Sequence, residues 1–221
     1  MIITFSHPKG GVGKTLLAFN YAIYSINKNK EKVTVIDLDG QHSISNFNKL
    51  RALKTDLKPL EILTFDDVKE LVSFLQTHND HKIIIDTGGF DSAYNRVALA
   101  LADKIITPVS DSPVELMRLF DFDRILKEIS ETTKAGKIIT HIVLNRLHSS
   151  LKNIDYIKEP LIGKDSFVFL DSVVRDRARI KFSVSDGTSV FEEKDTIKDE
   201  KAIYELEALF REIDNLKTER I

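Results

Sequence analysis

Residues 6–15 read S-H-P-K-G-G-V-G-K-T, and the interpretation of the whole chain starts from this stretch. It follows an apolar, strand-like run at 2–5 and precedes a helix-like run at 16–23. The order strand, glycine-rich loop and helix is typical of a phosphate-binding loop, in which backbone N–H groups and a helix N-terminus face one anion. A triphosphate is the expected ligand. Lys14 would contact its β- and γ-phosphates, and the Thr15 hydroxyl would coordinate Mg²⁺.

This phosphate loop, residues 6–15, departs from the strict pattern G-x-x-x-x-G-K-[ST] at one position. Pro8 stands where the first glycine is required, and Lys9 instead opens the sequence K-G-G-x-G-K-T. The alternative interpretation is a glycine turn with two solvated lysines. The glycines, the lysine, the threonine and the flanking runs all agree with a phosphate loop, so we favour that interpretation.

The composition indicates one globular domain. The chain has 221 residues, 42% of them hydrophobic, so residues 1–221 are expected to form a single domain around one substantial core. The formal net charge of −2 does not by itself favour nucleic-acid binding, so any DNA contact needs a local basic patch. Without cysteines, disulfides and iron–sulfur clusters are excluded. No signal peptide or membrane-spanning run is expected, which predicts a soluble, cytoplasmic protein.

Short β-branched runs alternate with amphipathic helical patterns along the chain. The runs at 33–37, 82–86, 104–108 and 137–144 lack polar alternation, which is typical of strands covered on both faces. The predicted fold class is therefore α/β, a doubly wound, mainly parallel β-sheet flanked by helices, with its ligand at the carboxyl ends of the strands.

Local signals predict two helix starts and one turn. Asp66 is expected to cap a helix, and Ser112-Pro113-Val114-Glu115 has the pattern of a capping box with proline at the first helical position. His78 and His81 flank Asp80 but lack a third ligand, so we prefer a solvated turn to a metal site.

Two of the predicted strands end in carboxylates. Asp37 and Asp39 end one strand, and Asp86 ends another. An aspartate at the end of a strand beside a phosphate loop is a Walker B candidate, so Asp86 is expected to hold the water shell of Mg²⁺. The alternative interpretation for Asp37 and Asp39 is that they cap the helix that follows.

The residues after Asp86 continue as Thr87-Gly88-Gly89. Their glycines give the loop freedom to swing toward a γ-phosphate, so that the loop could sense hydrolysis. The alternative is a plain turn before a helix capped by Asp91 or Ser92.

The phosphate loop, D-L-D-G-Q at 37–41 and D-T-G-G at 86–89 together resemble the deviant Walker A ATPases of the ParA/MinD type, closest to the small plasmid-type ParA proteins. In that family the lysine matched by Lys9 crosses a dimer interface to the partner's nucleotide, where its charge stabilises phosphoryl transfer. The resemblance implies ATP and Mg²⁺ as cofactors. It also implies that Asp39 positions or deprotonates the attacking water and that Asp37 supports the metal shell. The implied catalytic residues are Lys9, Lys14 and Asp39.

The same resemblance extends the ATP site beyond the loop. Asn145 would read the adenine edge and Arg146 would stack on or flank the base, although a plain strand-to-loop turn is the alternative. Leu16 departs from the family, because many members have a second threonine there, and weaker contact with the α-phosphate is expected. The predicted ATP-binding residues are Lys9, Gly10, Gly11, Val12, Gly13, Lys14, Thr15, Leu16, Asn145 and Arg146, and the predicted metal residues are Thr15, Asp37 and Asp86.

The densest positive segment is the basic cluster Arg175, Arg177, Arg179 and Lys181. In an extended segment these four side chains would share one side, which predicts a stripe that contacts DNA phosphates. A solvated face is the alternative.

The leading hypothesis is a ParA-like ATPase for DNA partition or cargo positioning. It predicts a homodimer when ATP is bound, non-specific DNA binding with nucleoid association, and slow hydrolysis stimulated by a small ParB-like adaptor. One alternative is a MinD-like membrane switch, for which the tail Lys217-Thr218-Glu219-Arg220-Ile221 is poorly suited, so no membrane contact is expected. The others are a dethiobiotin-synthetase-like enzyme acting on a small carboxylate, and an interaction protein with negligible hydrolysis.

Overall fold

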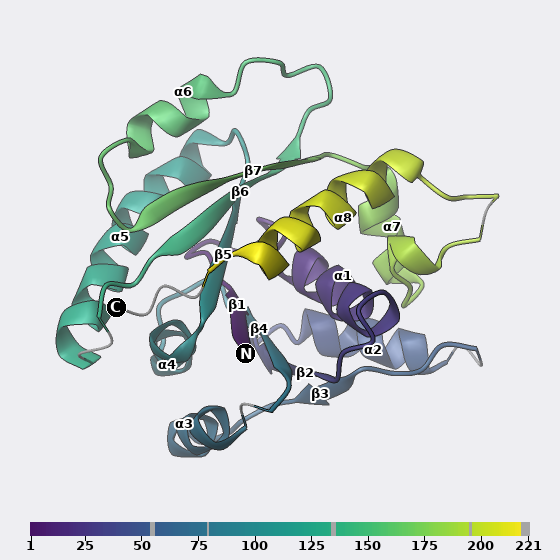
Figure 1. The fold of residues 1–221 in the computed structure, drawn as a ribbon, viewed down its shortest axis with the longest axis horizontal. Coiled ribbons are helices and arrows are strands. Elements are labelled where there is room, and N and C mark those ends of the chain that lie inside the picture. Colours follow the sequence, from purple (N-terminus) through teal and green to yellow (C-terminus); the bar gives the residue numbers. More distant parts are fainter. Residues whose placement is uncertain (54–55, 79, 134–135, 195, 218–221) are drawn as a thin grey trace.

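A single parallel sheet forms the centre of the protein (Figure 1). The computed structural model describes residues 1–53, 56–78, 80–133, 136–194 and 196–217. In these ranges the seven strands are ordered β3-β2-β4-β1-β5-β6-β7, and every neighbouring pair is parallel. Strands are added on both sides of β1, so the sheet is doubly wound and the predicted fold class is confirmed.

Strands and helices alternate along the chain. The strands are β1 (Ile2–Phe5), β2 (Val33–Leu38), β3 (Glu61–Leu63), β4 (Lys82–Thr87), β5 (Lys104–Val109), β6 (Thr140–Leu147) and β7 (Phe167–Arg175). The helices are α1 (Lys14–Asn27), α2 (Ser43–Ala52), α3 (Val68–Thr77), α4 (Ala93–Leu101), α5 (Pro113–Thr133), α6 (Asp155–Lys158), α7 (Ala178–Ser185) and α8 (Glu200–Asn215), with short 3₁₀ turns η1 (Glu159–Leu161) and η2 (Val190–Glu192).

The helices cover both faces of the sheet. Figure 1 shows α1, α2, α7 and α8 on one side and α3, α4 and α5 on the other. Alternate strand residues face these two layers: Ile84 of β4 packs with the α1 and α8 side, and its neighbours Ile83 and Ile85 pack with the α3 and α4 side. Burial on both faces explains why this strand has no polar alternation.

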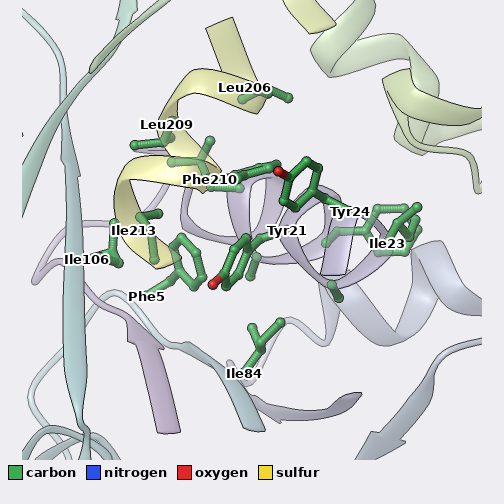
Figure 2. Packing of buried hydrophobic residues seen from close by; sticks show 14 of the residues in the cluster. Phe5, Tyr21, Ile23, Tyr24, Ile84, Ile106, Leu206, Leu209, Phe210 and Ile213 are labelled. Carbon is green, nitrogen blue, oxygen red and sulfur yellow. The ribbon is translucent and has the colours of Figure 1, made fainter. Parts of the chain in front are cut away.

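The larger core lies between the sheet, α1 and α8 (Figure 2). The ring of Tyr21 in α1 lies 5.9 Å from that of Phe5 in β1 and 5.0 Å from that of Phe210 in α8. Burying each such ring contributes roughly 2–3 kcal/mol. Since α1 begins at Lys14, this packing also fixes where the phosphate loop ends.

Two local predictions were wrong. The cap of α3 is Asp67 rather than Asp66, because the Asp67 side chain accepts a hydrogen bond from the Lys69 N–H. His81 does not lie in a solvated turn; its largely buried ring contacts Thr34 Oγ1 at 2.9 Å and Asp80 Oδ1 at 2.6 Å. Among the described residues, no group of three or more His, Cys, Asp or Glu could hold a metal ion.

In the described part of the chain, no helix is both long and apolar enough to cross a membrane. Most of the C-terminal tail considered for membrane contact, residues 218–221, lies outside the described residues.

Buried charges hold α8 at the amino end of the sheet, opposite the phosphate loop. The ammonium of Lys82, at the start of β4, donates to Tyr21 Oη at 3.1 Å, Ser25 Oγ at 3.1 Å and Asp214 Oδ1 at 2.9 Å. Lys104, at the start of β5, donates to the carbonyl oxygens of residues 213 and 214. A buried ammonium is tolerated only when it is paired in this way.

We expect Asp214→Ala to destabilise the protein by about 2 kcal/mol, because the buried Tyr21 hydroxyl loses its acceptor and the Lys82 ammonium loses one carboxylate while it keeps Glu31 at 2.6 Å. The midpoint and slope of urea unfolding measure the loss. Glu207→Ala on the same helix is the matched control, since its Arg211 partner is exposed and such pairs contribute less than about 1 kcal/mol. Equal losses in the two variants would contradict the role given to this network.

Candidate functional site

The backbone of the phosphate loop depends on two glycines. Gly11 and Gly13 have φ angles of +79° and +103°, in the left-handed region that favours glycine. A Cβ on Gly13 would also lie 2.4 Å from Asn145 Nδ2. Any side chain at position 13 would therefore strain the loop and displace a neighbour from β6.

Asn145 and Arg146, at the end of β6, support the loop. Asn145 Nδ2 donates to the Val12 carbonyl oxygen at 2.9 Å, and the Arg146 guanidinium donates to the Gly11 carbonyl oxygen. Both residues also line a small hollow together with Leu16 and residues 174–177, 180 and 181. The adenine contacts assigned to Asn145 and Arg146 stay a prediction.

The two lysines of the loop have different surroundings. Lys14 is 4% exposed, and its Nζ donates to the Lys9 carbonyl oxygen at 3.1 Å, across the inside of the loop. Burial lowers the pKa of Lys14, while the charges of Asp86 and Asp39 act in the opposite direction. The Lys9 side chain is 35% exposed, and its Nζ lies 3.4 Å from Glu115 Oε1 on α5. Lys14 is thus placed for a phosphate of its own loop, whereas Lys9 faces α5.

Glu115 is a site residue that sequence reasoning missed. Its carboxylate is 2% exposed, accepts the Ser110 N–H at 2.8 Å and lies 3.8 Å from the Arg146 guanidinium. Burial by itself would raise the pKa of Glu115, but the Ser110 hydrogen bond and the charges of Arg146 and Lys9 hold it below its usual value. The predicted helix start with proline at the first helical position is confirmed, but the predicted closure of the capping box by Glu115 was wrong. The Ser112 N–H donates to Ser110 Oγ instead, and the Glu115 carboxylate lies near Lys9 of the phosphate loop. Local spacing cannot show which distant cations meet a side chain.

Asp86 is the buried carboxylate best suited to a metal. It is fully buried at the end of β4, and neither carboxylate oxygen has a hydrogen-bond partner of normal geometry among the described residues. Burial raises the pKa of Asp86 to about 7, against the lowering influence of the Thr15 hydroxyl and Lys14. Buried oxygens without partners next to a hydroxyl fit the oxygen ligands that Mg²⁺ prefers. Asp86 and Thr15 are therefore the residues that would hold the ion, which would offset the charge of a bound triphosphate.

Asp37 lies in β2, where it is the register partner of Asp86, and Asp39 follows the strand. The buried Asp37 carboxylate accepts from Ser45 Oγ at 2.5 Å and from the Asp39 N–H at 3.2 Å. It therefore holds the turn that carries Asp39 and the start of α2, and its predicted support of the metal shell is not tested. Asp39 is half-buried, and one of its oxygens accepts from the Gln41 N–H. Its role toward a water stays a prediction.

The switch loop, residues 87–92 between β4 and α4, lies against the phosphate loop. A Cβ on Gly89 would lie 2.4 Å from the backbone nitrogen of Gly10. The Thr87 hydroxyl donates to the Phe5 carbonyl oxygen at 3.1 Å, and Ser92 caps α4 through the Asn95 N–H. Close backbone contact of this kind requires glycine and links the positions of the two loops.

The basic cluster is not one extended face, so the predicted geometry of the stripe was wrong. Arg175 ends β7, whereas Arg179 and Lys181 lie in α7, because the chain turns into a helix after Arg177. Their positive charges are also matched within the chain. Arg177 pairs with Glu205, Arg179 with Glu193 and Lys181 with Asp176, and Arg175 donates to the carbonyl oxygens of His148 and Leu151.

His7 is fully buried at the start of the phosphate loop, and no sequence signal singled it out. Its Nδ1 accepts a hydrogen bond from the Lys9 N–H at 3.0 Å. Burial and the nearby charge of Lys14 lower the pKa of His7 to about 4, so the ring is neutral at physiological pH.

Acidification is expected to destabilise the protein through His7. The unfolded chain takes up a proton on this ring near pH 6.5 and the folded chain only near pH 4, so stability present above pH 6.5 is lost as the pH falls between these values. The full difference corresponds to about 3 kcal/mol. The raised pKa of Asp86 has the opposite effect on stability as the pH falls. The measurement is therefore the free energy of unfolding in urea from pH 7 to pH 4, compared between wild type and His7→Asn.

The Asn side chain can still accept from the Lys9 N–H but does not titrate, so the variant should lose less stability on acidification. His148→Asn, at an exposed histidine, is the control and should follow wild type. Parallel curves for wild type and His7→Asn would contradict the assignment.

Comparison with known proteins agrees with this geometry. A family model described as the CobQ/CobB/MinD/ParA nucleotide binding domain matches residues 3–190. A search of curated proteins finds no match.

Solved structures share the fold at low sequence identity. A plasmid partition protein from Borrelia burgdorferi B31 bound to AMPPNP has a TM-score of 0.70 at 18% identity, over 97% of this chain and 99% of that chain. McdA from Cyanothece without nucleotide has a TM-score of 0.72 at 15% identity, over 96% and 98%. MinD from Pyrococcus horikoshii OT3 with Mg-ADP has a TM-score of 0.70 at 16% identity, over 97% and 96%.

The family match spans the phosphate loop, both aspartate-ended strands and the end of β6, and the structures align over nearly the whole chain. This chain therefore belongs to the CobQ/CobB/MinD/ParA nucleotide-binding domain family.

Proposed function

We propose that this protein is a ParA-like ATPase that partitions DNA or positions another cargo, and that ATP and Mg²⁺ join two copies of it into a homodimer. The observation that carries the proposal is the separation of the two loop lysines. Lys14 lies inside the loop, where it serves a nucleotide bound to its own subunit. Lys9 lies on the α5 side and is partly exposed, so it is available to a second copy.

The buried groups of the site support ATP and Mg²⁺ as ligands. The loop offers backbone N–H groups and Lys14 to a triphosphate, and Asp86 with Thr15 offers oxygen ligands to the metal. Related folds have been solved with AMPPNP and with Mg-ADP, which agrees with this ligand class.

Hydrolysis in this proposal depends on the second copy. A cation that arrives only on dimerisation would stabilise the charge that develops on the phosphoryl group, as an arginine finger does in other enzymes. Asp39, half-buried at the end of β2, would position the attacking water. Turnover would then be slow until the dimer forms and a small ParB-like adaptor stimulates it.

Lys9→Ala is expected to abolish dimerisation with a non-hydrolysable ATP analogue and to lower ATP turnover at least about a hundredfold, because the cation supplied in trans is lost. Asp39→Ala should still dimerise with ATP but hydrolyse it at least about a hundredfold more slowly. Sedimentation velocity and phosphate release measure the two effects.

The control for Lys9→Ala is Lys49→Ala, an exposed lysine of α2 that should behave as wild type. If Lys9→Ala dimerises and hydrolyses like this control, Lys9 does not act across an interface. Retained hydrolysis in Asp39→Ala would remove the proposed role of that carboxylate.

DNA binding by the ATP-bound dimer, with nucleoid association, completes the proposal. The basic cluster could contact DNA only if phosphates replaced Glu205 and Glu193 as partners of Arg177 and Arg179. Such an exchange is electrostatically reasonable because phosphate accepts the same bidentate hydrogen bonds as a carboxylate.

Arg177→Ala with Arg179→Ala is expected to weaken ATP-dependent DNA binding and to reduce its salt dependence by about two counterions. Binding isotherms at several salt concentrations measure the slope, and circular dichroism checks that the variant is folded. Arg124→Ala, at an exposed arginine of α5, is the control. An unchanged slope in the double variant would exclude these two arginines as phosphate contacts.

A further inference from the structure

A small cavity lies between the phosphate loop and the switch loop. Its volume is about 10 Å³, which is the space of one water molecule. Its walls include His7 from the phosphate loop, Gly88 and Phe90 from the switch loop, and Asn95 from the first turn of α4. The cavity therefore touches both elements that would respond to a γ-phosphate.

Two buried polar atoms of the residues that line this cavity have no hydrogen-bond partner among the described residues. They are His7 Nε2 and Asn95 Oδ1, on side chains that belong to residues 0% and 5% exposed. The backbone of Glu115 lies close enough to act on the pKa of His7 in the direction opposite to burial, but no hydrogen bond of normal geometry forms at His7 Nε2 among the described residues. Buried polar groups of this kind normally have a partner, commonly an internal water.

The other atoms of these side chains determine which one donates and which one accepts. His7 Nδ1 accepts the Lys9 N–H at 3.0 Å, so the proton of the neutral ring is on Nε2. Asn95 Nδ2 donates to the carbonyl oxygens of Phe90 at 2.6 Å and Gly88 at 3.3 Å, which leaves Oδ1 as an acceptor. The residues that line a space for one water thus include one unpartnered donor and one unpartnered acceptor.

We propose that one water in this cavity accepts from His7 Nε2–H and donates to Asn95 Oδ1, and that His7 and Asn95 are positioning residues that connect the switch loop to the backbone of Lys9. The connection is continuous: switch-loop carbonyls, Asn95, water, His7 and the Lys9 N–H. Movement of the switch loop toward a γ-phosphate would reach Lys9 through it. This use rests on the proposed function, whereas the water and its two hydrogen bonds belong to the nucleotide-free chain.

The first test is a crystal structure of the nucleotide-free protein at a resolution that orders internal waters. We expect one water within hydrogen-bond distance of both His7 Nε2 and Asn95 Oδ1. A cavity without a water, or a water that contacts only one of the two atoms, would overturn the proposal.

The second test uses two substitutions that divide the functions of the imidazole. His7→Asn keeps an acceptor for the Lys9 N–H but cannot reach the cavity, and His7→Gln keeps a donor that reaches the cavity. Hydrogen exchange of residues 88–96 in the nucleotide-free protein should be about threefold to tenfold faster in His7→Asn, because a buried hydrogen bond is lost. In His7→Gln it should stay nearer to wild type, and His148→Asn is the control. Equal exchange in His7→Asn and wild type would overturn the proposal.

The response to nucleotide is read with a single fluorophore. The chain contains no tryptophan, so Phe90→Trp places one reporter on the switch loop. Addition of Mg²⁺ and a saturating concentration of a non-hydrolysable ATP analogue should change its emission, and adding His7→Asn should reduce that change by at least about half at saturation. An unreduced emission change would overturn the coupling to nucleotide. Absence of analogue binding in the protein without substitutions would instead refute the proposed function. The crystallographic water and the hydrogen-exchange rates would then still test the connection between the switch loop and Lys9.

Discussion

The structure depends on a steric constraint: the backbone of the phosphate loop leaves no room for side chains at two points of contact. A Cβ on Gly13 of the phosphate loop would collide with Asn145 of β6. A Cβ on Gly89 of the switch loop would collide with the phosphate-loop backbone at Gly10. β6 and the switch loop follow the loop by more than 70 residues in the chain, yet both contact its backbone directly. A loop held in this way keeps its N–H groups oriented before any anion arrives, which lowers the entropic cost of binding.

Electrostatics within this rigid frame explain why the site fits a triphosphate and a metal. Among the described residues, Asp86 is buried without a hydrogen-bond partner of normal geometry, Lys14 donates a hydrogen bond to a carbonyl oxygen, and Glu115 lies near the cations of Lys9 and Arg146. An arrangement of buried charges of this kind costs stability in the free protein, and it is typical of sites where a charged ligand completes the pairing. The same burial that perturbs the pKa values of Asp86 and His7 therefore prepares the site for its ligands.

The remainder of the molecule maintains that frame from a distance. Tyr21, Phe210 and their neighbours hold α1 against α8, and the buried ammonium groups of Lys82 and Lys104 hold the far end of α8. On the other face α4 brings Asn95 to the switch loop, and α5 brings Glu115 to Lys9 of the phosphate loop. Function thus depends on side chains from several elements that share no local sequence pattern.

The sequence by itself determined the fold class, the phosphate loop and the two aspartate-ended strands, because glycine spacing and strand-like runs are local properties that neighbouring residues dictate. Only the tertiary structure decided the roles of Glu115 and His7. Glu115 meets Lys9 and Arg146 from distant segments, although the capping pattern at Ser112 suggested a different use, and His7 is buried where α5 brings Glu115 close to it. The basic cluster shows the same limit. The alternation of basic residues predicted that they share one face. The turn into α7 separates them instead, and the carboxylates of Glu205 and Glu193 form ion pairs with two of them. Side-chain partners depend on which segments pack together, and a linear pattern does not contain that information.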